Sequence, residues 1–220
     1  MVRTRSAFCS SAFAVLRLST TSNLVGCTSR SAGFSPERTT GIGLGVKLPT
    51  GRITSPADRY GNRPYDRDTM PGTGSTDLQM NGYHVGALAP RLGWFAQAQY
   101  RFAVATRGGY RPGNEFDGAL GVSFDLLASD RAIGVQPALS LLGSVRARDS
   151  GSEANAANSG YRRLLIAPGI KLRLNRRLSL YGDIELPLAQ YANAAPPGTA
   201  DSAGQLVAPV QFKLQVAYGF

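Results

Sequence analysis

The chain has 220 residues, which is enough for one domain and short for two. No run approaches the ~18 uninterrupted apolar residues of a membrane-spanning helix, so the sequence excludes that class of membrane protein. The formal net charge of +10 is spread along the chain without a basic helix, zinc-ligand spacing or an aromatic ribonucleoprotein signature, which argues against a nucleic acid partner.

Residues 1–38 are rich in Ser, Thr and Arg and lack any two-residue alternation. A charged start and the apolar residues 7–16 resemble a secretion signal, which Arg17 interrupts, and residues 24–27 (LVGC) resemble a lipoprotein cleavage box that would make Cys27 lipid-bearing. We predict an atypical leader, signal-like or disordered, over 1–38 and one barrel domain over 39–220. Both cysteines, Cys9 and Cys27, fall in the leader, so the barrel is expected to have neither a disulfide nor a thiolate metal site.

From residue 40 onward apolar and polar residues alternate, as a strand requires when its two faces meet different surroundings. The last segment is the clearest example, with Phe212 and Leu214 opposite Lys213 and Gln215. The segment 77–88 is less regular because Asn-Gly-Tyr-His at its centre blurs the period. The predicted strands are 40–48, 77–88, 94–104, 116–126, 135–148, 163–173, 178–188 and 210–220.

The gaps between these strands alternate in length. Gaps at about 49–76, 105–115, 149–161 and 189–205 are long, whereas those at about 89–93, 127–134 and 175–177 are short. Tight turns at one end and extended loops at the other are typical of an outer-membrane barrel, so we predict an all-β, antiparallel, up-and-down transmembrane β-barrel of about eight strands. The chain end then lies on the short-turn, periplasmic side, where Tyr218 and Phe220 resemble a signal for outer-membrane assembly machinery.

The two faces of the predicted strands differ in chemistry. One face is bulky and apolar, with aromatics near strand ends, and we expect it to contact lipid; these aromatics are Trp94, Phe102, Phe116, Phe124, Tyr218 and Phe220. The other face is rich in Gly, Ala, Ser and Gln and is expected to line the lumen. Its predicted charged residues are Arg101, Asp117, Asp125, Lys171, Asp183, Glu185 and Lys213. We interpret these charges first as mutually paired and second as lining a pathway, and expect other basic residues to meet lipopolysaccharide phosphates.

Several segments resemble the outer-membrane transporter family named for the meta-pathway (MetA) of phenol degradation. They are residues 45–51 (GVKLPTG), 71–77 (PGTGSTD), 146–151 (RARDSG), 205–209 (QLVAP) and the ending 218–220 (YGF). The resemblance implies a barrel in the outer membrane of a Gram-negative bacterium that admits aromatic or other hydrophobic small molecules. Pro71, Gly72, Gly74 and Asp77 are expected to form a turn that leads the chain back into the barrel. Family members have further strands before the LPTG segment, so the alternative is a larger barrel truncated on its N-terminal side.

Catalytic motifs are weak in this sequence. His84 is the single histidine and has no nucleophile motif nearby, so we expect a structural or lumen-facing role. The glycine run 41–45 lacks a phosphate-loop pattern and is better explained by close packing on a strand face. Asp183 and Glu185 lie two residues apart without a partner acid on another element, a weak sign of hydrolase chemistry. We predict no enzyme, cofactor or metal, and a passive channel for small solutes; the alternatives are a structural or adhesive barrel and a soluble lipocalin-like one.

Overall fold

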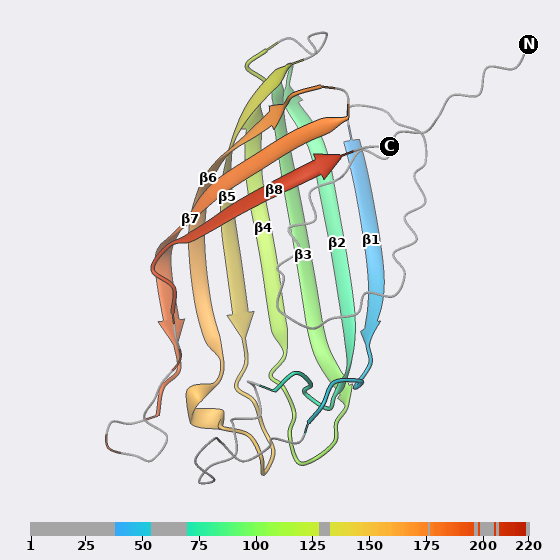
Figure 1. The fold of residues 1–220 in the computed structure, drawn as a ribbon, viewed down its shortest axis with the longest axis vertical. Coiled ribbons are helices and arrows are strands. Elements are labelled where there is room, and N and C mark those ends of the chain that lie inside the picture. Colours follow the sequence, from blue (N-terminus) through green and yellow to red (C-terminus); the bar gives the residue numbers. More distant parts are fainter. Residues whose placement is uncertain are drawn as a thin grey trace, which may run out of the picture.

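The computed structural model describes residues 38–53, 70–127, 133–175, 177–195, 198, 205 and 207–218. These residues form one antiparallel sheet in which every strand pairs with its neighbours in sequence (Figure 1). The strands are β1 (Arg38–Lys47), β2 (Thr76–Ala89), β3 (Leu92–Ala105), β4 (Glu115–Phe124), β5 (Gly134–Arg146), β6 (Tyr161–Arg173), β7 (Leu178–Ala192) and β8 (Gln211–Tyr218). The prediction of an all-β, up-and-down fold with eight strands is therefore confirmed. The predicted leader lies outside the described residues.

The sheet is strongly curved but open. In Figure 1 the strands wrap around a hollow, and β8 crosses in front of the others. β1 and β8 are the two edges, and no ladder joins them among the residues that the structure describes. One short 3-10 helix, Ala156–Asn158, lies between β5 and β6. No helix in the described part of the chain is both long enough and apolar enough to cross a membrane.

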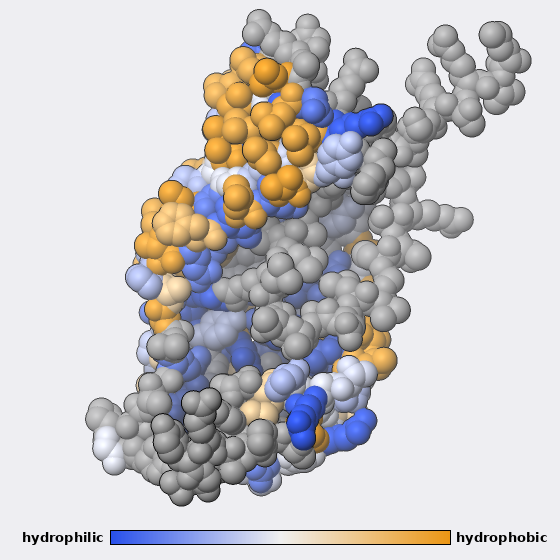
Figure 2. Space-filling model, in the orientation of Figure 1, coloured by the Kyte–Doolittle hydropathy of each residue, from blue (hydrophilic) through white to orange (hydrophobic). Residues whose placement is uncertain are grey.

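Burial is inverted relative to a water-soluble sheet. We call the apolar face, which carries Phe212 and Leu214, the outer face, and the polar face, which carries Asp183 and Glu185, the inner face. Phe212 and Leu214 are 78% and 80% exposed, whereas Asp183 and Glu185 are 7% and 8% exposed. Figure 2 shows hydrophobic side chains on the outside of the upper strands and hydrophilic ones in the hollow. Because alternate residues point to opposite faces, a single-residue slip of any strand would exchange the two environments.

Glycines on the inner face make room for large neighbouring side chains. A Cβ atom on Gly41 would lie 2.3 Å from the Tyr83 ring, and one on Gly43 would lie 2.6 Å from Asn81 Oδ1. On β4, a Cβ atom on Gly121 would lie 2.4 Å from the Phe95 ring. The strand register places each glycine directly opposite the side chain that it accommodates. The close-packing interpretation of the glycine run 41–45 therefore agrees with the structure, at least for Gly41 and Gly43.

The connections alternate in length only in part: the β3–β4 and β4–β5 connections, predicted to be long and short, have nine residues each, whereas the others follow the prediction. Two residues join β2 to β3, and a short turn after β6 uses the Asn175 carboxamide to accept hydrogen bonds from the backbone N–H groups of Arg177 and Leu178, each at 2.8 Å. Tyr218 pairs with Leu178, the first residue after this turn, so β8 ends on the short-turn side. The role of Tyr218 and Phe220 as an assembly signal stays a prediction, and Phe220 lies outside the described residues.

Arg91 in the β2–β3 turn has a φ of 72°, a conformation that favours glycine. It follows Pro90, and proline before a residue with positive φ is the pattern of a type II turn. We expect Arg91→Gly to raise the free energy of unfolding by about 0.5–1 kcal/mol, because relief of strain exceeds the extra entropy of the unfolded chain. Urea unfolding checks this, with Arg177→Gly as the control outside that turn; a lower midpoint for Arg91→Gly than for the unmodified chain would contradict it.

Candidate functional site

The candidate site is the polar inner face together with the loops at the end of the sheet opposite the short turns. Six of the seven residues predicted to line the lumen lie at inner-face positions of the strands: Arg101, Asp117, Lys171, Asp183, Glu185 and Lys213. The seventh, Asp125, follows the end of β4, where it is exposed and accepts a hydrogen bond from Gln136 at 3.0 Å. The inner face thus gathers charges from distant parts of the chain, and Asp125 sits at its short-turn rim.

Lys213 on β8 forms ion pairs with two carboxylates of β7. Its Nζ lies 3.1 Å from Glu185 Oε1 and 4.0 Å from Asp183 Oδ2, and the strand register places it opposite Asp183. Asp183 Oδ1 is buried and has no hydrogen-bond partner. Two buried carboxylates therefore share one ammonium, so this part of the inner face is short of positive charge.

A second ion pair closes the start of the sheet. Lys47 Nζ lies 2.8 Å from Asp77 Oδ2, between β1 and β2, and 2.5 Å from Thr73 Oγ1. Asp77 is 2% exposed, so this pair replaces water that the carboxylate loses on burial. Sequence reasoning assigned Asp77 only to a turn motif and missed Lys47. The signal was present, since both residues fall at the end of a strand on the polar face.

The turn motif itself is closely packed against the end of β1. A Cβ atom on Gly72 would lie 2.4 Å from backbone atoms of Gly51, and the Gly72 N–H donates to the Arg52 carbonyl at 3.1 Å. Gly74 has a φ of 70°, which glycine adopts without strain. Pro71 lies in a bend, Gly72 packs against the segment that follows β1, and Asp77 already belongs to β2, so the turn role of these residues stays a prediction.

A third cluster connects β3, β4 and β6. Arg101 forms an ion pair with Glu115, whose other oxygen accepts a hydrogen bond from the Tyr161 hydroxyl at 2.6 Å. The guanidinium of Arg163 lies over the Tyr161 ring, 4.7 Å from its centroid. Asp117 accepts a hydrogen bond from Ser144. Glu115 and Tyr161 escaped sequence reasoning because each is the first residue of its strand, where alternation is hardest to read.

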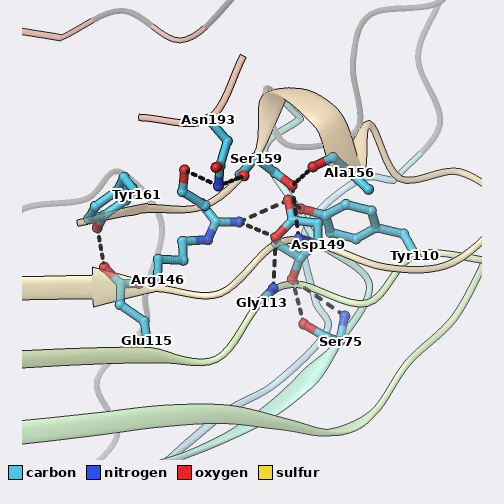
Figure 3. Close-up of polar contacts among 12 residues, drawn as sticks. Ser75, Tyr110, Gly113, Glu115, Arg146, Asp149, Ala156, Ser159, Tyr161 and Asn193 are labelled. Carbon is cyan, nitrogen blue, oxygen red and sulfur yellow. Dashed lines mark hydrogen bonds and ion pairs between the residues drawn. The ribbon is translucent and has the colours of Figure 1, made fainter. Parts of the chain in front are cut away.

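Asp149 is the centre of a polar network that joins three connections at the long-loop end (Figure 3). It is 3% exposed and accepts hydrogen bonds from the Tyr110 hydroxyl at 2.6 Å and from the Gly113 N–H at 2.7 Å. Arg146 reaches both of its oxygens, at 2.8 and 3.0 Å. We call Asp149 and these three partners the loop hub. It ties the β3–β4 loop to the β5–β6 loop.

The hub extends to the connection that leaves β7. Ser159 Oγ accepts a hydrogen bond from the Asp149 N–H at 2.8 Å, and Asn193 donates to the carbonyls of Ser159 and Gly160. The Ala195 N–H donates to Asn158 at 2.7 Å. The described residues of these three connections therefore form a polar layer. Residues 146–151 resemble a segment of a known family, but nothing in the sequence alone indicates a buried aspartate.

His84 lies on the outer face near the short-turn end. Its Nδ1 is 2.6 Å from Thr40 Oγ1, and its ring centroid is 5.0 Å from that of Trp94. The lumen-facing alternative for His84 is therefore wrong, because β2 turns even-numbered residues outward at this point, and the structural role fits its contacts. In the part of the chain that the structure describes, no group of three or more His, Cys, Asp or Glu side chains could hold a metal ion.

No protein-family model matches the chain, and a search of curated proteins likewise returns no match.

Proposed function

We propose that this chain is an outer-membrane β-barrel of a Gram-negative bacterium and acts as a passive conduit for small solutes along its polar inner face. The observation that carries the proposal is the inverted burial of the sheet. Ile42 on β1 is 90% exposed, and Phe212 and Leu214 on β8 are 78% and 80% exposed. The carboxylates of Asp77, Asp183 and Glu185 are instead buried. In water, exposing these apolar side chains and burying these carboxylates would both cost free energy. In a bilayer the exposed apolar side chains contact lipid favourably, and the buried carboxylates are kept out of the hydrocarbon.

Aromatic side chains on the outer face support a bilayer as the surrounding medium. Trp94 and Phe102 lie eight residues apart on β3, and Phe116 and Phe124 lie eight apart on β4, near the two ends of each strand. Eight residues span about 27 Å of strand, or roughly 20 Å of bilayer depth at a tilt of ~40°. That is close to the ~25 Å apolar band of such barrels, which aromatic girdles border on both sides.

The same arrangement argues against a soluble ligand-binding barrel. A lipocalin-like protein fills its interior with bulky apolar side chains and turns its charges to water. Here Leu214 and Ile170 face away from the hollow and are exposed, while Lys213 and Asp183 contact each other across its wall.

The expected partners follow from this location. Exposed arginines at the long-loop end suit lipopolysaccharide phosphates, to which a guanidinium binds in a bidentate manner; they are Arg52, Arg107, Arg111, Arg148 and Arg162. The chain end at the short-turn side suits the outer-membrane assembly machinery.

Trp94 offers a direct test of the membrane location because it is the single tryptophan of the chain and lies on the outer face. In vesicles whose acyl chains carry bromine, we expect strong quenching of Trp94 fluorescence, greatest for bromines near the headgroups. A Trp94→Phe, Tyr181→Trp variant moves the fluorophore to the inner face and should be quenched much less. Equal emission of the unmodified chain in brominated and ordinary vesicles would contradict the proposal.

Solute flux tests the conduit. Lys213→Gln leaves Asp183 and Glu185 without their shared ammonium, so in a planar bilayer we expect the reversal potential to shift towards cation preference. Arg162→Gln, on the outer face, is the matched control and should leave the reversal potential unchanged. Absence of any conductance and of liposome swelling from correctly folded protein would refute the conduit while leaving the barrel intact.

A structural or adhesive barrel is the second candidate function. The loop hub favours it, because the hub and the hydrogen bonds of Asn158, Ser159 and Asn193 tie three connections together at the long-loop end. An eight-stranded barrel is also about filled by its own side chains. A folded, membrane-inserted protein without flux that still binds cells or surfaces through this end would favour the second candidate over the first.

Removal of Phe220 is expected to reduce assembly several-fold, because a terminal aromatic resembles the signal that the assembly machinery reads. The measurement is the amount of heat-modifiable protein in outer-membrane fractions, with Val207→Ala as a control upstream of β8. Unchanged levels in the strain that lacks Phe220 would show that this residue is not required.

A further inference from the structure

The two edge strands of the sheet, β1 and β8, each pair with only one neighbour among the described residues. In hydrocarbon each unpaired backbone group of an edge strand is costly, so a membrane-embedded sheet of this kind must find a partner for both β1 and β8. Among the residues that the structure describes, the outer residues of these strands are some of the most exposed large hydrophobic ones, including Ile42 and Leu44 on β1 and Leu214 and Val216 on β8. The two strands have opposite directions in an up-and-down sheet of eight strands, so they can pair with each other in the antiparallel manner.

We propose that β8 pairs with β1 within the same chain and closes an eight-stranded barrel of shear number eight, with Gln211 opposite Lys47 and Tyr218 opposite Thr40. This inference rests on the membrane location proposed above. In Figure 1 the arrowhead of β8 points towards the beginning of β1 in this view, as such a register requires.

The register of the sheet fixes which closures are possible. Paired residues form a row across it, namely Leu186, Ile166, Leu141, Leu120, Ala96, His84 and Thr40. On β8 this row continues at Val210, because Gln211 pairs with Glu185. The row therefore meets β1 at Thr40 and β8 at Val210. The shear number is the number of residues along β1 from Thr40 to the residue that pairs with Val210 when the sheet closes. It must be even, because an odd value would turn apolar residues of one strand to the polar face of the other.

Among the even values, eight fits the side chains best. It uses all of β8 and sets Phe212 opposite Val46, Leu214 opposite Leu44 and Val216 opposite Ile42, so that the outer face is apolar across the seam. On the inner face, Lys213 then meets Gly45, where the absence of a β1 side chain leaves space, and Gln215 meets Gly43 beside the Asn81 carboxamide, with which it can form a hydrogen bond.

The neighbouring values fit less well. A shear number of ten sets Lys213 directly opposite Lys47, and like charges at opposed positions repel. A value of six moves Val216 opposite Thr40 and Tyr218 opposite Arg38, so the outer face is less apolar across the seam. Displacement in the other direction along the chain would move β8 beyond Arg38, where β1 begins.

Closure in this register limits what the proposed conduit can pass. Eight strands at shear eight tilt by about 36°, and their interior is about filled by side chains. The solutes are then water, ions and other small polar molecules that can move between the charged groups of the inner face, and bulkier aromatic compounds are excluded.

Disulfide cross-linking tests the register. The full chain, with Cys9→Ser and Cys27→Ser, carries the pair Leu44→Cys and Leu214→Cys, and is oxidised after insertion into vesicles. Directly opposed residues of an antiparallel pair have Cβ atoms within the range that a disulfide spans. We expect the monomer to form an intramolecular disulfide roughly tenfold faster than Leu214→Cys paired with Val46→Cys or Ile42→Cys, which match shear ten and six. Phe212→Cys with Val46→Cys repeats the test at a second place in the same register.

The outcomes separate this inference from the proposed function. Fastest cross-linking of a control pair would overturn the register, and a cross-linked dimer would show that β1 and β8 pair with a second copy of the chain. Failure of both pairs of the proposed register in protein that resists carbonate extraction would refute closure while leaving the membrane location standing. Loss of membrane association in the unmodified chain would instead refute the proposed function.

Discussion

Leu214→Arg is expected to prevent stable insertion, whereas Gln215→Arg, one residue along β8, is expected to be tolerated. Leu214 lies near the middle of β8 on the outer face, and an arginine at the bilayer midplane costs about 2–4 kcal/mol. Gln215 lies on the inner face, where polar residues already gather. The measurement is the fraction of heat-modifiable protein after refolding into vesicles and its midpoint in urea.

The expected effect of Leu214→Arg depends on whether the outer face contacts lipid or water. Leu214 is 80% exposed, so in a soluble protein an arginine there would be nearly neutral or would improve solubility. Equal folding of the two variants in a detergent-free buffer would therefore contradict the assignment of the outer face to lipid. Leu214→Ala controls for the loss of the leucine side chain without adding charge.

Asp149→Ala is expected to disorder the long-loop end and to lower the free energy of unfolding by about 3–5 kcal/mol, the usual cost of removing one partner from a buried ion pair. The change leaves the Arg146 guanidinium, the Tyr110 hydroxyl and the Gly113 N–H without the acceptor that joins them. The buried Arg146 Nε already lacks a hydrogen-bond partner, so little else nearby can compensate. Limited proteolysis of the β3–β4 and β5–β6 loops and urea unfolding measure the two effects.

Two variants control this experiment. Asp149→Asn keeps an acceptor for the Tyr110 hydroxyl and should cost less than the alanine variant. Asp125→Ala removes an exposed aspartate with one hydrogen bond, to Gln136, and should change the free energy of unfolding by about 0.5 kcal/mol or less. Unchanged protease resistance of the loops in Asp149→Ala would show that the hub does not order the long-loop end.

The distribution of charge on the inner face determines which ions the proposed conduit would favour. Its charges are arranged in local groups, of which the triad of Asp183, Glu185 and Lys213 is the most unequal in sign. A passage along β7 and β8 would therefore attract cations more than a passage along β1 and β2, where Lys47 and Asp77 balance. A change of ion selectivity in Lys213→Gln would thus show that ions pass along β7 and β8, in addition to showing that flux exists.

Alternation by itself located the strands and showed which of their residues share a face. It succeeded because a strand that separates two media must place unlike residues at successive positions, a pattern local enough to be read from the chain. Loop lengths likewise determined that β8 ends on the short-turn side. The predicted strand 77–88, whose centre blurs the period, is confirmed as β2.

Only the tertiary structure decided which polar residues act together. Lys47 meets Asp77 and Thr73, Glu115 meets Arg101 and Tyr161, and Asp149 collects donors from two loops, because strand register and loop return bring together residues far apart in the chain. No local pattern encodes these distances, since burial of a charge depends on partners that several connections must deliver at once. The outward position of His84 was decided in the same way, by the pairing of β2 with β1 and β3 rather than by any feature of its own segment.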